Sequence, residues 1–324
     1  MAAKPPSAPA TPGDLESPGQ WPGRLTESGS PFSGVTARSP KADLEAFFAS
    51  PAIRELALQV CDIGRRMWQR AYVDGNGGNL AIRVGEDLAL CTPTLISKGF
   101  MKPEDLCLVD LEGNQLAGAR KRTSEILMHL QLMQRQRRAV ASVHCHPPYS
   151  TGFAVAGVEP PTCLTSEFEL TVSLATAPYC TPGTPELGRL VAELVDQHNT
   201  ILMANHGVVA WSHRNVEDAY FKIETLEAYC HTVLIASQLG KPLKRITPAQ
   251  LQELLKLKQR QGIPDPRYGL ERCERCNSAE WRPGVTCAAA HCAASPPASP
   301  VRGRELDEAL VQAVADQIRA RTMI

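Results

Sequence analysis

The chain of 324 residues is 43% hydrophobic, enough for one good-sized core with appended segments. Its 34 basic and 34 acidic side chains give a formal net charge of zero, so nothing indicates a surface for nucleic acid or acidic membrane. No apolar run is long enough to span a bilayer, and the first residues lack the basic-then-apolar order of a secretory signal. We therefore expect a cytoplasmic protein that binds neither nucleic acid nor membrane.

The 11 cysteines are odd in number and do not form a regular disulfide pattern. Seven of them are scattered through apolar segments: Cys61, Cys91, Cys107, Cys145, Cys163, Cys180 and Cys230. This distribution predicts reduced, buried thiols, as in a cytoplasmic protein.

Residues 1–42 are rich in Pro, Ser, Gly and Ala, which predicts a disordered arm. Ser50 and Pro51 then supply an N-cap and a first-turn proline for a helix. That helix has one apolar stripe, formed by Leu56, Val60, Ile63 and Met67.

Strand-like and helical segments alternate irregularly after this first helix. Strands are predicted at residues 80–84, 88–91 and 106–111, and helices at residues 185–195, 216–239 and 248–261. Several strand pairs are close enough in the chain to be hairpins. The pattern predicts an α/β fold with a mixed, largely antiparallel sheet and helices on its faces. It contains no internal repeat and no Rossmann or Walker fingerprint.

His144 and His146 give the most informative signal for function. They end an apolar run, residues 139–143, that predicts a strand, and two prolines follow them. Side chains two apart in a strand point to the same face, so both imidazoles aim at one spot. Two converging neutral imidazoles favour a divalent transition-metal site, and the alternative is a pair of partly exposed histidines on a strand edge.

Two further segments extend this candidate site. Ser124 is a predicted N-cap that places Glu125 in the first turn of a helix, where the helix dipole favours an ionised carboxylate. His206 lies in a turn between the apolar runs 200–204 and 208–211. Three imidazoles and one carboxylate suit a catalytic metal with an exchangeable position. The alternatives are a glutamate that only stabilises its helix and a histidine that only occupies a turn.

Several short motifs occur in an order that is typical of one family. They are Gly78-Asn79, Thr92-Pro93-Thr94, Thr123-Ser124-Glu125, His144-Cys145-His146, Ala177-Pro178-Tyr179, Gly183-Thr184 and Asn205-His206-Gly207. Over about residues 51–262 the chain resembles the class II aldolase and adducin-head family, which includes sugar-phosphate aldolases, epimerases and dehydratases. The resemblance implies a three-layer α/β/α sandwich with a central, largely antiparallel sheet, and a cyclic homotetramer.

The resemblance also implies roles for the candidate residues. His144, His146 and His206 match the ligands of a catalytic divalent metal, for which we expect zinc. Glu125 matches the family glutamate that ligates the metal or acts as a proton shuttle. Glu167 stands roughly where fuculose-phosphate aldolases carry a catalytic tyrosine, and it is the candidate acid that one subunit supplies to its neighbour's site.

The family binds substrate phosphate with backbone and hydroxyl donors. The matching positions in this chain are Gly78, Asn79, Thr94, Thr123 and Ser124. Two positions depart from the family: Ala81 replaces a frequent Ser or Thr, and Leu95 replaces a frequent Gly. These departures imply an altered phosphate pocket, in which Lys98 could supply compensating charge.

By resemblance, the expected activity is that of a lyase. The enzyme would cleave a phosphorylated ketose of the fuculose or rhamnulose 1-phosphate type to dihydroxyacetone phosphate and an aldehyde. A glutamate near position 167 occurs in the dehydratase branch, so a sugar-phosphate dehydratase or 4-epimerase stays open. Adducin heads share the fold as non-catalytic interaction modules but lack the metal ligands, so the histidines favour an enzyme.

The composition changes after the expected catalytic domain, residues 43–262. Residues 263–303 form a cysteine-containing tail and linker. Four cysteines in it have zinc-knuckle-like spacing and could form a second, structural zinc site: Cys273, Cys276, Cys287 and Cys292. The alternative is a flexible tail with exposed thiols.

Residues 304–324 predict one amphipathic helix. This segment resembles the encapsulation peptides that dock enzymes onto the shell or cargo of bacterial microcompartments, which would place the enzyme inside such a compartment. The alternative is docking of the helix onto its own tetramer.

Overall fold

The computed structural model describes residues 34–269. Contacts divide the chain into two units, residues 1–287 and 288–324, and only the first contains described residues. Most of the expected arm, residues 1–42, lies outside the described range. The same holds for the candidate zinc ligands Cys273, Cys276, Cys287 and Cys292 and for the helix at 304–324, which stay predictions.

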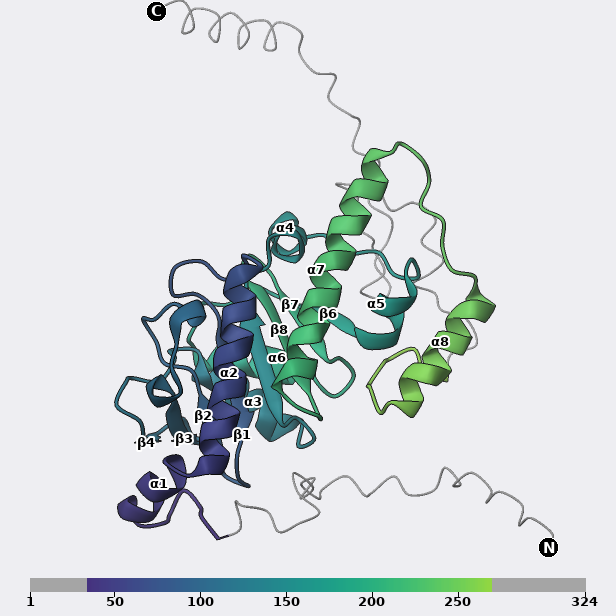
Figure 1. Ribbon diagram of the computed structural model, residues 1–324. Helices are drawn as coiled ribbons and strands as arrows, with labels where there is room; N and C mark the ends of the chain where they lie inside the picture. Colours follow the sequence, from purple (N-terminus) through teal and green to yellow (C-terminus); the bar gives the residue numbers. More distant parts are fainter. Residues whose placement is uncertain (1–33, 270–324) are drawn as a thin grey trace, which may run out of the picture. The chain divides into compact units, whose positions relative to one another are not determined.

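The described residues form helices and strands in an α/β order (Figure 1). They are α1 Lys41–Phe48, α2 Pro51–Gln69, β1 Asn79–Arg83, β2 Leu88–Cys91, η1 Lys98–Phe100, η2 Pro103–Asp105, β3 Cys107–Asp110, β4 Gln115–Ala117, α3 Ile126–Arg135, β5 Ala141–Cys145, α4 Pro148–Ala156, α5 Ser166–Thr171, β6 Leu174–Ala177, α6 Pro185–Ala192, β7 Thr200–Met203, β8 Gly207–Ser212, α7 Val216–Gln238 and α8 Pro248–Arg260. None of the described helices is both long and apolar enough to cross a membrane.

The strands form one eight-stranded sheet in the order β4-β3-β2-β1-β5-β8-β7-β6. Neighbouring strands are antiparallel, except for the parallel pair β6 and β7. The expectation of a largely antiparallel sheet is confirmed. At the centre, β5 pairs with β1 on one side and β8 on the other, so the strand that carries His144 is flanked by two long-range partners.

Helices cover both faces of the sheet (Figure 1). Leu80 and Ile82 of β1 pack with buried residues of α2 and α7, whereas Ala81 between them packs with residues of α3 and α6. This alternation follows from the period of a strand, whose successive side chains point to opposite faces. The three-layer α/β/α sandwich is therefore confirmed.

Local sequence signals explain where α2 begins and which side it buries. The Ser50 side chain accepts a hydrogen bond from the Ile53 amide, so the expected N-cap is confirmed. Val60, Ile63 and Met67 of the predicted stripe are buried. Several short elements were not anticipated, among them α1, α4, α5, β4 and β6, because segments this short have little hydrophobic periodicity.

Most of the described cysteines are free thiols, as the sequence predicts. Cys61, Cys91, Cys107, Cys145 and Cys230 are buried and free, and Cys180 is partly exposed and free. Burial raises the pKa of the Cys61 thiol to about 11. The prediction is wrong for Cys163, which is disulfide-bonded.

The packed region continues past Gly262 through a buried ionic network. Lys258 of α8 donates to Asp265, and Arg267 donates to both Asp265 and Glu169 of α5, each at 2.7 Å. The Lys258 and Glu169 side chains are fully buried. Burial raises the pKa of Asp265, but hydrogen bonds from Arg267 and the charge of Lys258 outweigh it and hold this pKa well below its usual range.

The network should be a large local contribution to stability. Arg267→Ala leaves the Glu169 and Asp265 carboxylates buried without their guanidinium partner, which costs about 3–5 kcal/mol of unfolding free energy. Urea unfolding followed by circular dichroism measures this loss. Because the folded pKa of Asp265 is depressed, its stabilising contribution is present above about pH 4 and is lost as the pH falls below that value.

Arg189→Ala provides the control, because Arg189 pairs with Glu186 and Glu193 on the exposed side of α6. Exposed pairs contribute little, so this variant should unfold almost like the wild type. Equal stability of the Arg267 and Arg189 variants would contradict the structural role of the network.

Candidate functional site

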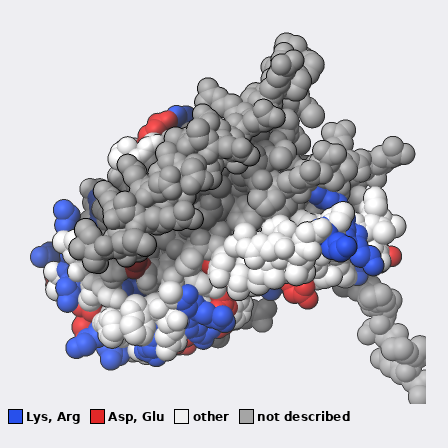
Figure 2. Space-filling view, turned by 90° about the horizontal axis from the view of Figure 1, so that it is seen from above, with Lys and Arg blue, Asp and Glu red and all other residues white. Residues whose placement is uncertain are grey.

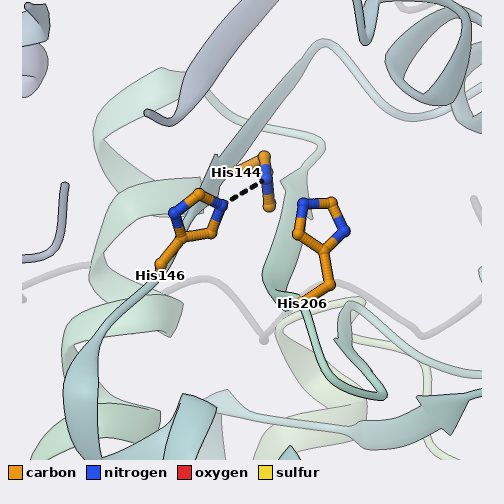
Figure 3. A group of neighbouring side chains, drawn as sticks. All are labelled: His144, His146 and His206. Carbon is orange, nitrogen blue, oxygen red and sulfur yellow. Dashed lines mark hydrogen bonds between the residues drawn. The ribbon is translucent and has the colours of Figure 1, made fainter. Parts of the chain in front are cut away.

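Three imidazoles converge at one end of the central strands (Figure 3). His144 lies next to the last residue of β5, His146 directly follows this strand, and His206 lies in the turn between β7 and β8. One ligand atom from each ring lies within 4.8 Å of the others, and the Nε2 atoms of His144 and His146 are 3.2 Å apart. The structure thus brings together the three histidines that the sequence analysis selected.

Backbone contacts orient the first of these rings. His144 Nδ1 lies 2.9 Å from the Val208 carbonyl oxygen, to which it donates, so its Nε2 lone pair points toward the other histidines. Burial, followed by the charges of His146 and His206, lowers the pKa of His144 well below its usual range. The ring is therefore neutral, which is the form that binds metals.

The β7–β8 turn needs its glycine for close packing. A Cβ atom at Gly207 would lie 2.6 Å from the Cys145 carbonyl oxygen and 2.6 Å from Cδ2 of His146. A glycine here lets the turn approach the end of β5 closely enough for His206 to join the other two rings.

Glu125 completes the cluster. Its Oε2 lies 3.5 Å from Nε2 of His144, and its Oε1 lies 3.4 Å from Nε2 of His206. The Asn79 side-chain amide donates to Oε2 at 2.7 Å. Oε1 is buried and has no hydrogen-bond partner among the described residues.

The start of α3 differs from the prediction. Helix α3 begins at Ile126, Glu125 takes the N-cap position, and Ser124 makes no capping hydrogen bond. The Thr123 hydroxyl, rather than that of Ser124, accepts the hydrogen bond of the Glu125 amide, and Ser124 and Glu125 form a turn before the helix. The expectation that Ser124 caps the helix and that Glu125 lies in its first turn is therefore wrong.

The donor set fits a divalent transition metal. Three imidazoles and a carboxylate are ligands that zinc and its neighbours accept. The buried Oε1 of Glu125 has no hydrogen-bond partner among the described residues, so this oxygen is free to accept either a cation or a proton at the site.

The candidate phosphate-binding positions fall into two neighbouring segments and one strand end. The Thr94 amide donates to the Lys121 carbonyl, so the loop of Thr94 lies beside the segment that carries Thr123 and Ser124. Ser124 is exposed and Thr94 partly so, whereas Gly78 and Thr123 are buried. Asn79 is buried at 3% exposure, and its side chain is engaged by other protein groups.

Lys98 places a buried cation near this region. Its Nζ donates to the carbonyl oxygens of Asn76 and Ile96, both at 2.8 Å, and the residue is only 1% exposed. Burial lowers the pKa of Lys98 to about 8, and the charge of Glu125 opposes that shift. Lys98 therefore keeps part of its positive charge at neutral pH.

Glu167 lies elsewhere in its own chain. It is exposed on α5 and lines an open pocket with Arg70, Tyr72 and Glu224, and none of the three clustered histidines lines that pocket. No contact of Glu167 with the three histidines is found among the described residues, so its role at the cluster stays a prediction.

Sequence reasoning missed His129, which is fully buried on α3. It hydrogen-bonds to Asn79 and Ser142 behind Glu125. The available signal was spacing, because His129 lies one helical turn after Glu125 and shares its helix face.

The described part of the surface carries both signs of charge. Figure 2 shows one face on which Lys and Arg lie among Asp, Glu and uncharged side chains, and neither sign covers it alone.

Comparison with known proteins places this site in a family. The chain is 36% identical over 183 residues to L-fuculose phosphate aldolase from Methanococcus maripaludis. The matched region covers 56% of this chain and 96% of that protein. It is 29% identical to 3-oxo-tetronate 4-phosphate decarboxylase from Haemophilus influenzae, over 63% of this chain and 96% of that protein. The structure of YgbL from Escherichia coli, described as a putative aldolase/epimerase/decarboxylase, matches with a TM-score of 0.58 and 26% identity over 63% of this chain and 99% of that chain. Residues 58–234, more than half of the chain, match the class II aldolase and adducin N-terminal domain, so the protein belongs to that family.

Proposed function

We propose that this protein is a metal-dependent lyase that cleaves a phosphorylated ketose to dihydroxyacetone phosphate and an aldehyde. The observation that carries the proposal is the convergence of three imidazoles, two of which lie within 3.5 Å of the Glu125 carboxylate, whose Oε1 is buried and unpartnered. The likeness to L-fuculose phosphate aldolase supports a sugar phosphate as substrate. A non-catalytic, adducin-like module would have no need of this ligand set.

The residues of the cluster have distinct tasks in this proposal. His144, His146 and His206 hold a divalent ion, for which zinc is our choice because all three ligands are imidazoles. When bound, the ion supplies Lewis-acid charge beside the oxygens of the ketose.

Glu125 provides the proton transfer. Its Oε1 takes the proton of the substrate hydroxyl, the adjacent C–C bond breaks, and the aldehyde leaves. The electron pair stays on the ketone-derived fragment as an enediolate, and return of the proton from Glu125 to that carbon yields dihydroxyacetone phosphate and restores the carboxylate. No lysine Schiff base is involved.

The phosphate of the substrate would lie at the neighbouring loops. The hydroxyls of Thr94 and Ser124 and the backbone near Gly78 offer neutral donors, and Lys98 adds positive charge behind them. Thr123 is buried and supports this segment by accepting the Glu125 amide hydrogen bond at 3.3 Å.

A screen of sugar phosphates tests the proposal. The metal-loaded protein is offered L-fuculose 1-phosphate, L-rhamnulose 1-phosphate, L-ribulose 5-phosphate and a 3-oxo-tetronate 4-phosphate, and the products are separated by class. Release of dihydroxyacetone phosphate is expected. Exclusive formation of an epimer, a dehydrated sugar or carbon dioxide would replace the aldolase with another activity, such as that named for the decarboxylase relative.

Metal content should depend on the cluster. His144→Ala removes one of three imidazoles, so the purified protein should lose about one equivalent of bound zinc and all activity while remaining folded. Elemental analysis measures the metal. His231→Ala is the control, since His231 stacks on Tyr149 and is not one of the three clustered histidines, so this variant should keep the metal. A His144 variant with full metal content would refute the assignment.

Glu125→Gln keeps the size of the side chain but removes the base. If Oε1 takes the proton, kcat should fall by about 100-fold or more, with a much smaller change in KM. Steady-state kinetics on the substrate found in the screen gives both constants. Unchanged kcat would leave Glu125 with a purely structural role.

We also propose a homotetramer in which Glu167 of one subunit serves the site of the next. Mixed tetramers of Glu167→Ala and His144→Ala chains should then recover part of the activity that each variant lacks. Verified mixed tetramers without recovered activity would exclude a shared site. The control for Glu167→Ala is Glu159→Ala, which removes an exposed acidic side chain that precedes α5. This control variant should stay active on its own.

A further inference from the structure

A buried chain of hydrogen bonds lies behind Glu125. The Ser142 hydroxyl is 2.6 Å from Nδ1 of His129, and Nε2 of His129 is 2.5 Å from Oδ1 of Asn79. The Asn79 side-chain nitrogen is 2.7 Å from Oε2 of Glu125. Ser142 and His129 are fully buried and Asn79 is 3% exposed, so water does not interrupt the chain.

The direction of every bond in this chain is determined by the carboxylate at its end. An ionised carboxylate only accepts, so Asn79 must present its NH₂ group to Glu125 and its oxygen to His129. His129 must then carry its proton on Nε2 and accept the Ser142 hydroxyl on Nδ1. Burial lowers the pKa of His129 to about 3, which agrees with the neutral ring that this order requires.

The network of hydrogen bonds connects the elements that carry the candidate metal site. Ser142 lies two residues before His144 on β5, Asn79 begins β1 opposite His144, and His129 lies on α3 one turn after Glu125. A shift of α3 against the sheet would break these bonds, so the network fixes the carboxylate relative to the histidines.

We propose that Ser142, His129 and Asn79 are positioning residues that hold Oε2 of Glu125 and so reserve Oε1 for proton transfer. Oε2 already accepts the Asn79 hydrogen bond, whereas Oε1 faces His206 with no partner among the described side chains. The inference rests on the proposed role of Glu125 as a base. It gives Asn79 a task different from the phosphate contact expected from the sequence.

Kinetics of three variants tests the proposal. His129→Leu and Asn79→Leu each interrupt the hydrogen-bond network. We expect kcat to fall about 10- to 100-fold at nearly constant KM, with bound metal retained. His129→Gln can still accept from Ser142 and donate to Asn79, and it should recover most of the lost kcat. Equal losses in kcat for the Leu and Gln variants, or losses confined to KM, would overturn the proposal.

Asn199→Leu is the matched control for removing a buried asparagine. Asn199 accepts from the Ser173 amide and donates to the Thr171 carbonyl, at the end of β7 opposite to the His206 turn. This variant should lose stability but keep kcat. A fall in kcat equal to that of Asn79→Leu would show that loss of any buried asparagine lowers kcat, and it would contradict a specific role of Asn79.

A second readout does not depend on activity. Nitrogen-15 NMR of histidine-labelled wild type, with the His129 signals assigned through His129→Gln, reports which ring nitrogen carries the proton. Protonation at Nε2 alone is expected, and protonation at Nδ1 or at both nitrogens would overturn the hydrogen-bond order. If no ketose phosphate is cleaved, the proposed function fails, while the NMR result still decides the hydrogen-bond order.

Discussion

The antiparallel pairing of β5 with β8 is the constraint on which the site depends. This pairing places His144 opposite Val209 and brings the His206 turn beside the end of β5. Because side chains alternate across a sheet, a slip of one residue would turn His144 toward the α2 and α7 layer. The partner strand β1 pairs on the other side, with Asn79 opposite His144, so the register also aligns the network behind Glu125.

Such a site lowers the stability of the fold that carries it. Glu125 Oε1 and His206 Nδ1 are both buried without hydrogen-bond partners among the described residues, and an unsatisfied buried group costs about 1–3 kcal/mol. The apolar layers on both faces of the sheet must offset this cost. A cation that binds only the folded chain would stabilise it by mass action, so occupancy of the site and stability of the fold should be linked.

The sequence predicted the features that depend on local pattern. Alternation identified His144 and His146, turn chemistry identified His206, and capping rules found the start of α2. The predicted start of α3 was wrong because the hydroxyl of Thr123, and not that of its neighbour Ser124, accepts the Glu125 amide hydrogen bond, and the two hydroxyls cannot be told apart by pattern. His129 was missed because its partners lie on two distant strands: its spacing from Glu125 was a local signal, but spacing alone does not identify those partners.

The two departures from the family pattern have different physical meanings. Ala81 is fully buried in the layer under α3, where its small side chain packs against the core and offers nothing to a ligand. Leu95 has φ of 56° and is 79% exposed, beside Thr94. This left-handed conformation explains why glycine is frequent there, since a side chain with a Cβ costs about 1–2 kcal/mol in it. Of the two departures, only Leu95 presents a side chain that a substrate at the Thr94 loop could touch.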